Sequence, residues 1–223
     1  SYQLLTLQKQ LNYKFGYVII ATEQLNSQCY DNKPYIELLK KNIVFPFSFQ
    51  ISKELKLKYE INSHSIYFFD FFTINDTIDF NERPIDFFFC GCKCDLREIE
   101  LNKLKLKYPD ANIEIDYDYS YTTPLEMMKK LKEVKYVINI PFYENSSMET
   151  HRIHRALSAN CKVISLKPHY KYEEEAYDEY VIFVDSLTDF EYDEVADNAE
   201  WNKLMEKHGV NVINHNVETL LKI

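Results

Sequence analysis

The segment Tyr136-Val-Ile-Asn-Ile-Pro-Phe-Tyr-Glu-Asn-Ser-Ser-Met-Glu-Thr-His-Arg-Ile-His-Arg-Ala-Leu-Ser-Ala-Asn-Cys-Lys-Val-Ile-Ser165 decides the fold. Its ends, residues 136–140 and 162–165, have the length and the β-branched composition of buried strands. Between them, residues 147–159 form an amphipathic pattern, and we expect a helix that begins near Ser147. A strand, a helix and a strand in this order predict two parallel strands joined by a crossover helix, so the segment indicates an α/β fold.

The same alternation of strand-like and helix-like segments extends along the chain in both directions. Short apolar runs predict further strands at residues 17–21, 43–45, 65–71, 85–90, 112–117 and 181–184. Amphipathic spacing predicts helices at residues 34–41, 51–59, 96–108 and 124–134. The tail, 191–223, is helical by composition, with an expected break at His208-Gly209-Val210. A polar stretch at residues 75–84 predicts two domains, 1–81 and 82–223, with no internal repeat of fixed period.

Charge and composition exclude several classes of protein. The chain has 223 residues and a net charge of −9, from 35 acidic and 26 basic residues. A polyanion partner requires a basic surface, so the charge argues against nucleic acid and against an anionic membrane. With only 3 glycines, the chain lacks the glycine-rich loops that commonly bind phosphates. A small phosphate-bearing ligand stays possible, because a few local donors suffice for it.

The cellular compartment is predicted from three sequence features: apolar runs, the N-terminal residues and the spacing of the cysteines. No apolar run approaches the ~20 residues that span a bilayer, and the first residues do not have a signal-peptide pattern. The five cysteines are an odd number without the spacing of a disulfide framework. We therefore expect a cytoplasmic protein with reduced thiols and no membrane span.

The loop and the predicted helix start after residue 140 form a candidate anion site. Ligands of open α/β sheets bind outside the carboxyl ends of the strands, and a helix N-terminus attracts phosphate. Glu149 falls in the first turn, and Arg152 follows three residues later on the same side, where its guanidinium could bind two phosphate oxygens. The alternative is a helix cap at Ser147 followed by a simple ion pair of Glu149 with Arg152.

This segment resembles the donor site of GT-B glycosyltransferases, of the kind found in families 1 and 4. The resemblance rests on the strand, the loop with Tyr143 and Glu144, the Glu149-Thr-His-Arg152 motif, and the final Val-Ile-Ser165. Two other pieces are similar to parts of the same family. Tyr17-Val-Ile-Ile-Ala-Thr-Glu23-Gln-Leu resembles a piece of its first lobe, and Ile85-Asp-Phe-Phe-Phe-Cys-Gly91 with Arg97 resembles the opening of its second lobe. All three pieces occur in family order.

The resemblance implies two Rossmann-like lobes with parallel sheets, the first small or truncated and on the acceptor side. The second lobe would bind a nucleotide-sugar such as a UDP- or GDP-sugar, and transfer to a glycan or other small acceptor would require neither a metal nor a cofactor. The donor-binding residues that it implies are Gly91, Arg97, Tyr143, Glu144, Asn145, Ser147, Glu149 and Arg152.

Three positions depart from the family pattern. Arg155 stands where the family has a second glutamate, Asn160 where it has glycine, and Leu166 where it often has glutamate. The ribose contact is therefore left open, with Glu149 as a substitute. Such departures are also expected in a catalytically inactive sugar- or nucleotide-binding module or in an α/β scaffold, so both stay as alternatives.

Gly91 and Arg97 also have an argument of their own. A residue without Cβ at the tip of a strand lets a phosphate or sugar approach the backbone, although a simple turn explains Gly91 equally well. Arg97 adds positive charge near the next helix start, or is a solvated surface residue. On the acceptor side, Glu23 is the candidate general base or a carboxylate that binds the acceptor, with Asp70 as a weaker candidate.

The sequence predicts no metal site. Cys90, Cys92 and Cys94 alternate, whereas structural zinc requires two to four intervening residues and a second pair of ligands. His151 and His154 have no matching cysteine or carboxylate cluster. The acidic run at residues 172–175 is expected to be a solvated loop or the start of a helix.

Overall fold

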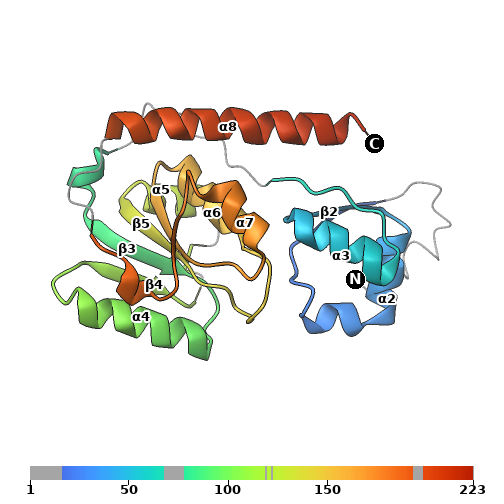
Figure 1. Cartoon of the computed structure of the whole chain (residues 1–223), viewed down its shortest axis with the longest axis horizontal. Coiled ribbons are helices and arrows are strands. Elements are labelled where there is room, and N and C mark those ends of the chain that lie inside the picture. Colours follow the sequence, from blue (N-terminus) through green and yellow to red (C-terminus); the bar gives the residue numbers. More distant parts are fainter. Residues whose placement is uncertain (1–16, 68–77, 119, 122, 193–197, 223) are drawn as a thin grey trace. The chain divides into compact units, whose positions relative to one another are not determined.

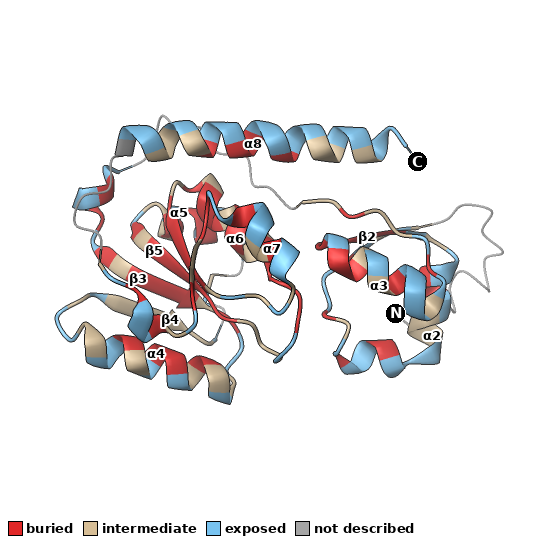
Figure 2. Ribbon diagram, viewed as in Figure 1, coloured by how far each residue is buried: buried red, intermediate tan, exposed pale blue. Residues whose placement is uncertain are grey.

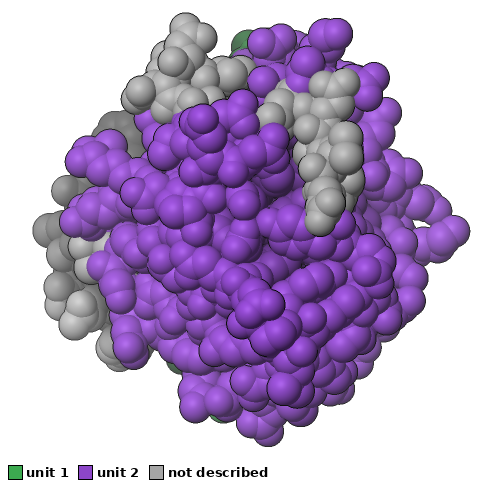
Figure 3. Space-filling view, turned by 90° about the vertical axis from the view of Figure 1, so that its left-hand side faces the viewer, with its two compact units in different colours: residues 1–67, 215–223 green, residues 68–214 purple. Residues whose placement is uncertain are grey.

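A computed structural model describes residues 17–67, 78–118, 120–121, 123–192 and 198–222 (Figure 1). The chain divides into two compact units, coloured separately in Figure 3. Unit 1 contains Ser1–Tyr67 and His215–Ile223, and unit 2 contains Phe68–Asn214. The sequence placed its boundary at residues 75–84, of which 75–77 lie outside the described residues.

Unit 1 contains a small parallel sheet. Strands β1 (Val18–Ala21) and β2 (Ile43–Pro46) pair in parallel, with Val18 opposite Ile43. Helices α2 (Lys33–Lys40) and α3 (Phe49–Tyr59) follow, with a 3-10 helix at Gln28–Asp31. The predicted third strand, 65–71, is not observed at residues 65–67, and residues 68–71 lie outside the described part. Ser63 instead makes a single parallel bridge to Val44.

Local signals set the helix boundaries of unit 1. The Asn32 side chain accepts a hydrogen bond from the Tyr35 N–H, and Pro34 occupies the first turn of α2. Ser48 caps α3 in the same way, and Glu60 ends that helix in the left-handed conformation (φ 59°). Asn216, at the far end of the chain, donates to the Tyr67 carbonyl and accepts from the Tyr67 N–H, each at 2.8 Å.

Unit 2 contains a five-stranded parallel sheet in the order β4-β3-β5-β6-β7. The strands are β3 (Ile85–Cys90), β4 (Ile113–Asp116), β5 (Val134–Asn139), β6 (Lys162–Leu166) and β7 (Ile182–Val184). The helices are α4 (Asp95–Lys107), α5 (Pro124–Leu131), α6 (Thr150–Ser158), α7 (Lys171–Tyr177) and α8 (Asn198–Leu220), with 3-10 helices at Phe80–Glu82 and Leu187–Asp189. The predicted α/β class with parallel sheets is confirmed, and the sheet is Rossmann-like.

Apolar layers cover both faces of this sheet. Along β5, Val137 packs with Met128 of α5 and Ile153 of α6 in one layer. Its neighbour Tyr136 points to the opposite face and packs in a layer with Leu104 of α4. Alternate residues of a strand therefore belong to opposite layers. The central strands β3, β5 and β6 are mostly buried, and Figure 2 shows β3 and β5 largely in red, whereas every residue of the edge strand β4 is only partly buried.

The strand order creates a switch point between β3 and β5. From β3 the chain crosses to β4 on one side, and β5 then returns to the other side of β3. The connections after β3 and β5 therefore diverge, which leaves a crevice at the carboxyl ends of these strands. Open α/β sheets bind ligands at such a point.

Two helix predictions are wrong. The helix expected to begin near Ser147 begins at Thr150, so Glu149 is its N-cap residue and not part of its first turn. The break expected at His208-Gly209-Val210 is absent, because α8 continues through it. A glycine in a helix costs about 1 kcal/mol relative to alanine. Burial of His208 and Val212 on either side of Gly209 offsets that cost.

Candidate functional site

A pocket of about 300 Å³ lies at the carboxyl edge of the unit 2 sheet. One wall is the loop after β5, residues 144–148, and the opposite wall is the loop after β6, residues 166–169. Asn139 and Ser165, the last residues of the paired parts of β5 and β6, also line it, with Leu96 of α4 and Asp185 after β7. The pocket therefore lies at the carboxyl ends of parallel strands, where open α/β sheets bind ligands. Its walls follow β5 and β6, one strand away from the switch point between β3 and β5.

Next to this pocket, Glu149 lies between two arginines. One carboxylate oxygen is 2.9 Å from Arg97 Nη2, and the other is 2.7 Å from Arg152 Nη2. Arg97 is 2% exposed and Glu149 is 7% exposed. Arg97 also donates to the backbone carbonyls of Ile140 and Cys92, at 3.0 and 2.8 Å. The pairing of Glu149 with Arg152 is present, but it belongs to a buried three-membered cluster and is not an exposed helical contact.

Burial and the two arginines have opposite effects on the pKa of the Glu149 carboxyl group. Burial alone would raise the pKa of the carboxyl group, because it disfavours the charged form. The guanidinium groups of Arg152 and Arg97 outweigh burial and hold the pKa of Glu149 below its usual value. Glu149 is thus an ionised carboxylate that pairs with both guanidinium groups and leaves the cluster with one excess positive charge.

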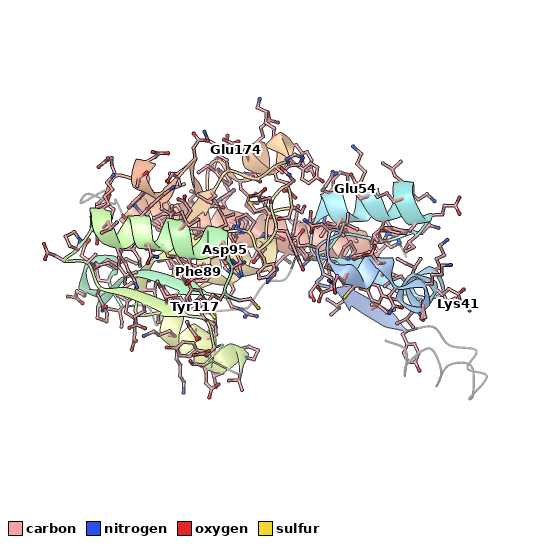
Figure 4. The ribbon with its side chains drawn as sticks, turned by 90° about the horizontal axis from the view of Figure 1, so that it is seen from below. Lys41, Glu54, Phe89, Asp95, Tyr117 and Glu174 are labelled. Atoms are coloured by element: carbon pink, nitrogen blue, oxygen red, sulfur yellow. The ribbon has the colours of Figure 1, made fainter. Side chains whose placement is uncertain are left out.

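Gly91 makes room for these arginines. A Cβ at this position would lie 2.9 Å from Arg152 Nη2 and 3.1 Å from Arg97 Nη1. Both guanidinium groups also lie over the ring of Phe89, at 5.3 Å for Arg152 and 5.2 Å for Arg97. Phe89, labelled in Figure 4, in turn contacts Tyr117 edge to face, with ring centroids 6.0 Å apart. The space at Gly91 thus serves two protein side chains.

A chain of hydrogen bonds connects the cluster to the pocket. Arg152 Nη1 is 3.4 Å from Asn139 Oδ1, and Asn139 Nδ2 donates to Ser165 Oγ at 2.9 Å. Asn139 and Ser165 are both buried and both line the pocket. Arg152 therefore acts on the pocket through Asn139, which it orients.

Glu173 of α7 occupies the position where the sequence placed an anion. Its carboxylate accepts hydrogen bonds from the Ser147 hydroxyl and, at 2.8 Å, from the Met148 N–H. It is 5% exposed, so the expectation of a solvated acidic run fails at this residue, although the run does form a helix. The long-range contact also holds residues 146–149 outside the helix, which explains why α6 begins late.

The residues predicted to bind the donor fall into two groups. Gly91, Arg97, Glu149 and Arg152 form the buried cluster. The pocket lining includes Glu144, Asn145 and Ser147, whereas Tyr143 contacts Phe142 edge to face and accepts the Ser146 hydroxyl at its carbonyl. Asn145 adopts the left-handed conformation, with φ 56°.

The acceptor-side residues belong to unit 1. Glu23 is exposed just after β1, and its backbone carbonyl accepts a hydrogen bond from Tyr30 at 3.5 Å. Asp70 lies outside the described residues.

The structure shows the conformation or the position of two residues that depart from the family pattern. Asn160 adopts the left-handed conformation (φ 58°) two residues after α6, which agrees with the expectation that asparagine can replace glycine there. Leu166 lines the pocket.

Six polar residues of the pocket were not among the predicted site residues. They are Asn139, Ser146, Ser165, Lys167, His169 and Asp185. The sequence does carry a signal for three of them, because Ser165, Lys167 and Asp185 stand at or just after predicted strands. Ligands bind at the carboxyl ends of all the parallel strands, and not only at the end of the strand near Ile140.

The cysteines and histidines that the sequence analysis considered as metal ligands have contacts with other protein groups. No group of three or more His, Cys, Asp or Glu side chains in the described ranges could hold a metal ion. Cys90 lies 3.7 Å from Asp116, and burial raises the pKa of its thiol to about 11. His154 contacts the Tyr177 hydroxyl at 2.6 Å and packs against His208.

Fold and pocket together define an α/β protein with parallel, Rossmann-like sheets and a ligand-sized pocket at a sheet edge. No family model matches the sequence, and no curated protein is similar to it. Among the described helices, none combines the length and the apolar character needed to cross a membrane.

Proposed function

We propose that this chain is a nucleotide-sugar-dependent glycosyltransferase of the GT-B kind whose donor binds in the pocket of unit 2. One observation carries the proposal. The loop at residues 144–148, which resembles the family's donor-site segment, forms one wall of a pocket at the carboxyl edge of a parallel sheet. A pocket of about 300 Å³ in that position suits a small phosphate-bearing ligand.

In this proposal the donor-binding residues act in two layers. Glu144, Asn145 and Ser147 contact the donor directly, because they line the pocket. Arg97, Glu149 and Arg152 do not contact the donor. They support the pocket by holding Asn139 and the loop of residues 144–148 in place. The leaving diphosphate is stabilised by the positive end of the α6 dipole and by Lys167 of the opposite wall, which pairs with Asp185 at 2.8 Å in the structure, without a metal.

The acceptor, a glycan or another small hydroxyl compound, is assigned to unit 1. Glu23 is the proposed general base or acceptor ligand, because it is an exposed carboxylate at the carboxyl end of β1. Replacement of Glu23 by Gln would separate these roles, since loss of a base lowers kcat and loss of a ligand raises KM.

A binding module without catalytic activity is the second candidate. The specific observation in its favour is that Glu149 is neutralised by two arginines while Glu173 accepts hydrogen bonds from Ser147 and Met148. These carboxylates are bound to other protein groups, as expected if a former active site had kept its fold and lost its activity. Such a module would bind the nucleotide and would not release it from a nucleotide-sugar.

Calorimetric and thermal-shift titrations with UDP, GDP and their sugars test the proposal. At a hundredfold excess over its Kd, one bound nucleotide should add about 2.7 kcal/mol to the free energy of unfolding, without added metal. Lys167→Glu, in the pocket wall, should weaken binding. Lys171→Glu, at an 85% exposed side chain outside the pocket, is the matched control and should not. An absence of binding by every nucleoside diphosphate at millimolar concentration contradicts the proposal, and binding without turnover favours the module.

A further inference from the structure

Glu173 ties together the two walls of the pocket. It lies on α7, just after the loop of residues 166–169, and its carboxylate accepts hydrogen bonds from Ser147 and Met148 of the opposite wall. The other end of α7 is anchored separately, by the hydrogen bond at 2.6 Å between the Tyr177 hydroxyl and His154. Residue 173 is therefore the point at which α7 contacts the loop that leads into α6.

The chemistry of this contact is that of an anion bound near a helix start. A carboxylate receives a hydroxyl and a backbone N–H two residues before α6, where the N–H groups and the helix dipole favour negative charge. Hydrogen bonds to an ionised acceptor are the stronger kind, and a carboxylate that is only 5% exposed depends on them. A phosphate oxygen would use the same two donors.

The carboxylate and a ligand phosphate exclude each other from these donors. Each donor carries one hydrogen, and two anions at this separation repel each other in a poorly solvated site. A phosphate that binds to Ser147 and Met148 must first release Glu173, and the release also frees the adjoining wall of the pocket.

We propose that Glu173 is a built-in competitor for the phosphate position of the pocket, so that phosphate binding and release of α7 from the β5 loop are one event. The inference rests on the proposed nucleotide site and adds its regulation. The pocket with Glu173 in place is the closed form, and the ligand-bound pocket has Glu173 withdrawn.

The test is titration with UDP, GDP and inorganic pyrophosphate of the full chain and of two variants. Glu173→Gln keeps the size of the side chain and removes its charge, so the Kd for these probes should fall about ten- to hundredfold, the equivalent of one charged hydrogen bond. Glu175→Gln, two residues away at an exposed pair with Lys171, is the matched control and should leave the Kd unchanged. Adding Ser147→Ala to Glu173→Gln should cancel most of the gain, because it removes the contested donor.

The outcomes for the inference and for the nucleotide site are distinguishable. If the unchanged chain binds the probes and Glu173→Gln binds them equally or more weakly, the competitor role is overturned and the nucleotide site stands. If only Glu173→Gln binds, both are supported, and if neither protein binds any probe, both are overturned. Should Glu173→Gln not fold, Glu173→Asp serves instead. It is one methylene too short to reach both donors but keeps the charge, so a smaller fall in Kd than for Glu173→Gln is expected.

Discussion

At the scale of single residues, Glu149 connects two helices of unit 2 through its carboxylate. It joins Arg97 on α4 to Arg152 on α6, and so fixes two helices on opposite faces of the sheet to each other. Both arginines also lie over Phe89, and Arg97 lies over Phe142. The cluster is a structural support of the pocket, whatever ligand the pocket takes.

Replacement of Glu149 by Ala should therefore be strongly destabilising. It leaves two largely buried guanidinium groups without a carboxylate, and removal of one partner of a buried ion pair costs about 3–5 kcal/mol. Urea denaturation followed by the fluorescence of Trp201, the one tryptophan of the chain, measures the change in the free energy of unfolding.

Glu179→Ala is the control for this prediction. Its ion pair with Lys207 has a similar length, 2.8 Å, but both side chains are more than half exposed, so the loss should be much smaller than that for Glu149→Ala. Equal effects of the two substitutions would show that the Glu149 cluster contributes no more than a surface pair.

At the scale of elements, the contact of α8 with α6 includes a pair of histidines, and we expect the free energy of unfolding to depend on pH through one of them. His208 of α8 is 5% exposed and faces His154 of α6 and the rings of Tyr177 and Tyr180. Burial lowers the pKa of His208 to about 4. In the unfolded chain the value is about 6.5, so between pH 6.5 and 4 the unfolded state binds the proton more tightly.

The free energy of unfolding should therefore fall as the pH drops from 6.5 towards 4, by up to about 3 kcal/mol from His208. His208→Phe removes one titrating group and keeps an aromatic ring. It should remove the His208 share of the slope and leave the share of His151, whose pKa burial also lowers to about 4. His169→Phe, at an exposed ring, should leave the curve as it is. Urea denaturation at half-unit pH intervals measures the slope, and a curve that keeps its shape in His208→Phe contradicts the assignment.

The elements also show how far the sequence could predict the structure. The strand at residues 85–90 was predicted with both ends correct, because a run of Phe and Ile buried on both faces has no competing interpretation. The helix predicted to begin at residue 124 does begin at Pro124, where Thr123 and Glu126 form a full capping box. Such signals are local, and the chain carries them in consecutive residues.

The candidate site was predictable only in part. The loop after β5 was found from its place behind a strand, and three of its predicted residues line the pocket. The capture of Ser147 and Met148 by Glu173 joins segments 25 and 26 residues apart, and no spacing rule reports such a contact. The burial of Arg97 has the same origin, since its partners Ile140 and Glu149 come from a different strand and helix.

At the scale of the whole molecule, the end of the chain belongs to the first unit. Asn216 pairs with both backbone groups of Tyr67, and His215 lies 3.1 Å from the Ser65 carbonyl. Asn216→Ala removes both hydrogen bonds to Tyr67 and should cost about 1–3 kcal/mol, because it leaves partly buried backbone groups unpaired.

Hydrogen exchange resolved by peptide tests where this loss is felt. Exchange should speed up in peptides of residues 18–67 and stay unchanged in the sheet of unit 2, residues 85–184. Asn211→Ala is the control for position, because residue 211 lies on the part of α8 that belongs to unit 2. This substitution should not speed up exchange in residues 18–67. Equal acceleration in both units would show that they unfold as one.

The contact between Tyr67 and Asn216 also bears on the order in which the molecule is made. The two residues are separated by 149 positions, and they belong to the same unit. A ribosome produces β1, β2 and their helices first, yet the last piece of that unit emerges only after all of unit 2. We therefore expect the body translated first to be completed last, and chains arrested before residue 215 should protect the amides of unit 2 but not those of unit 1.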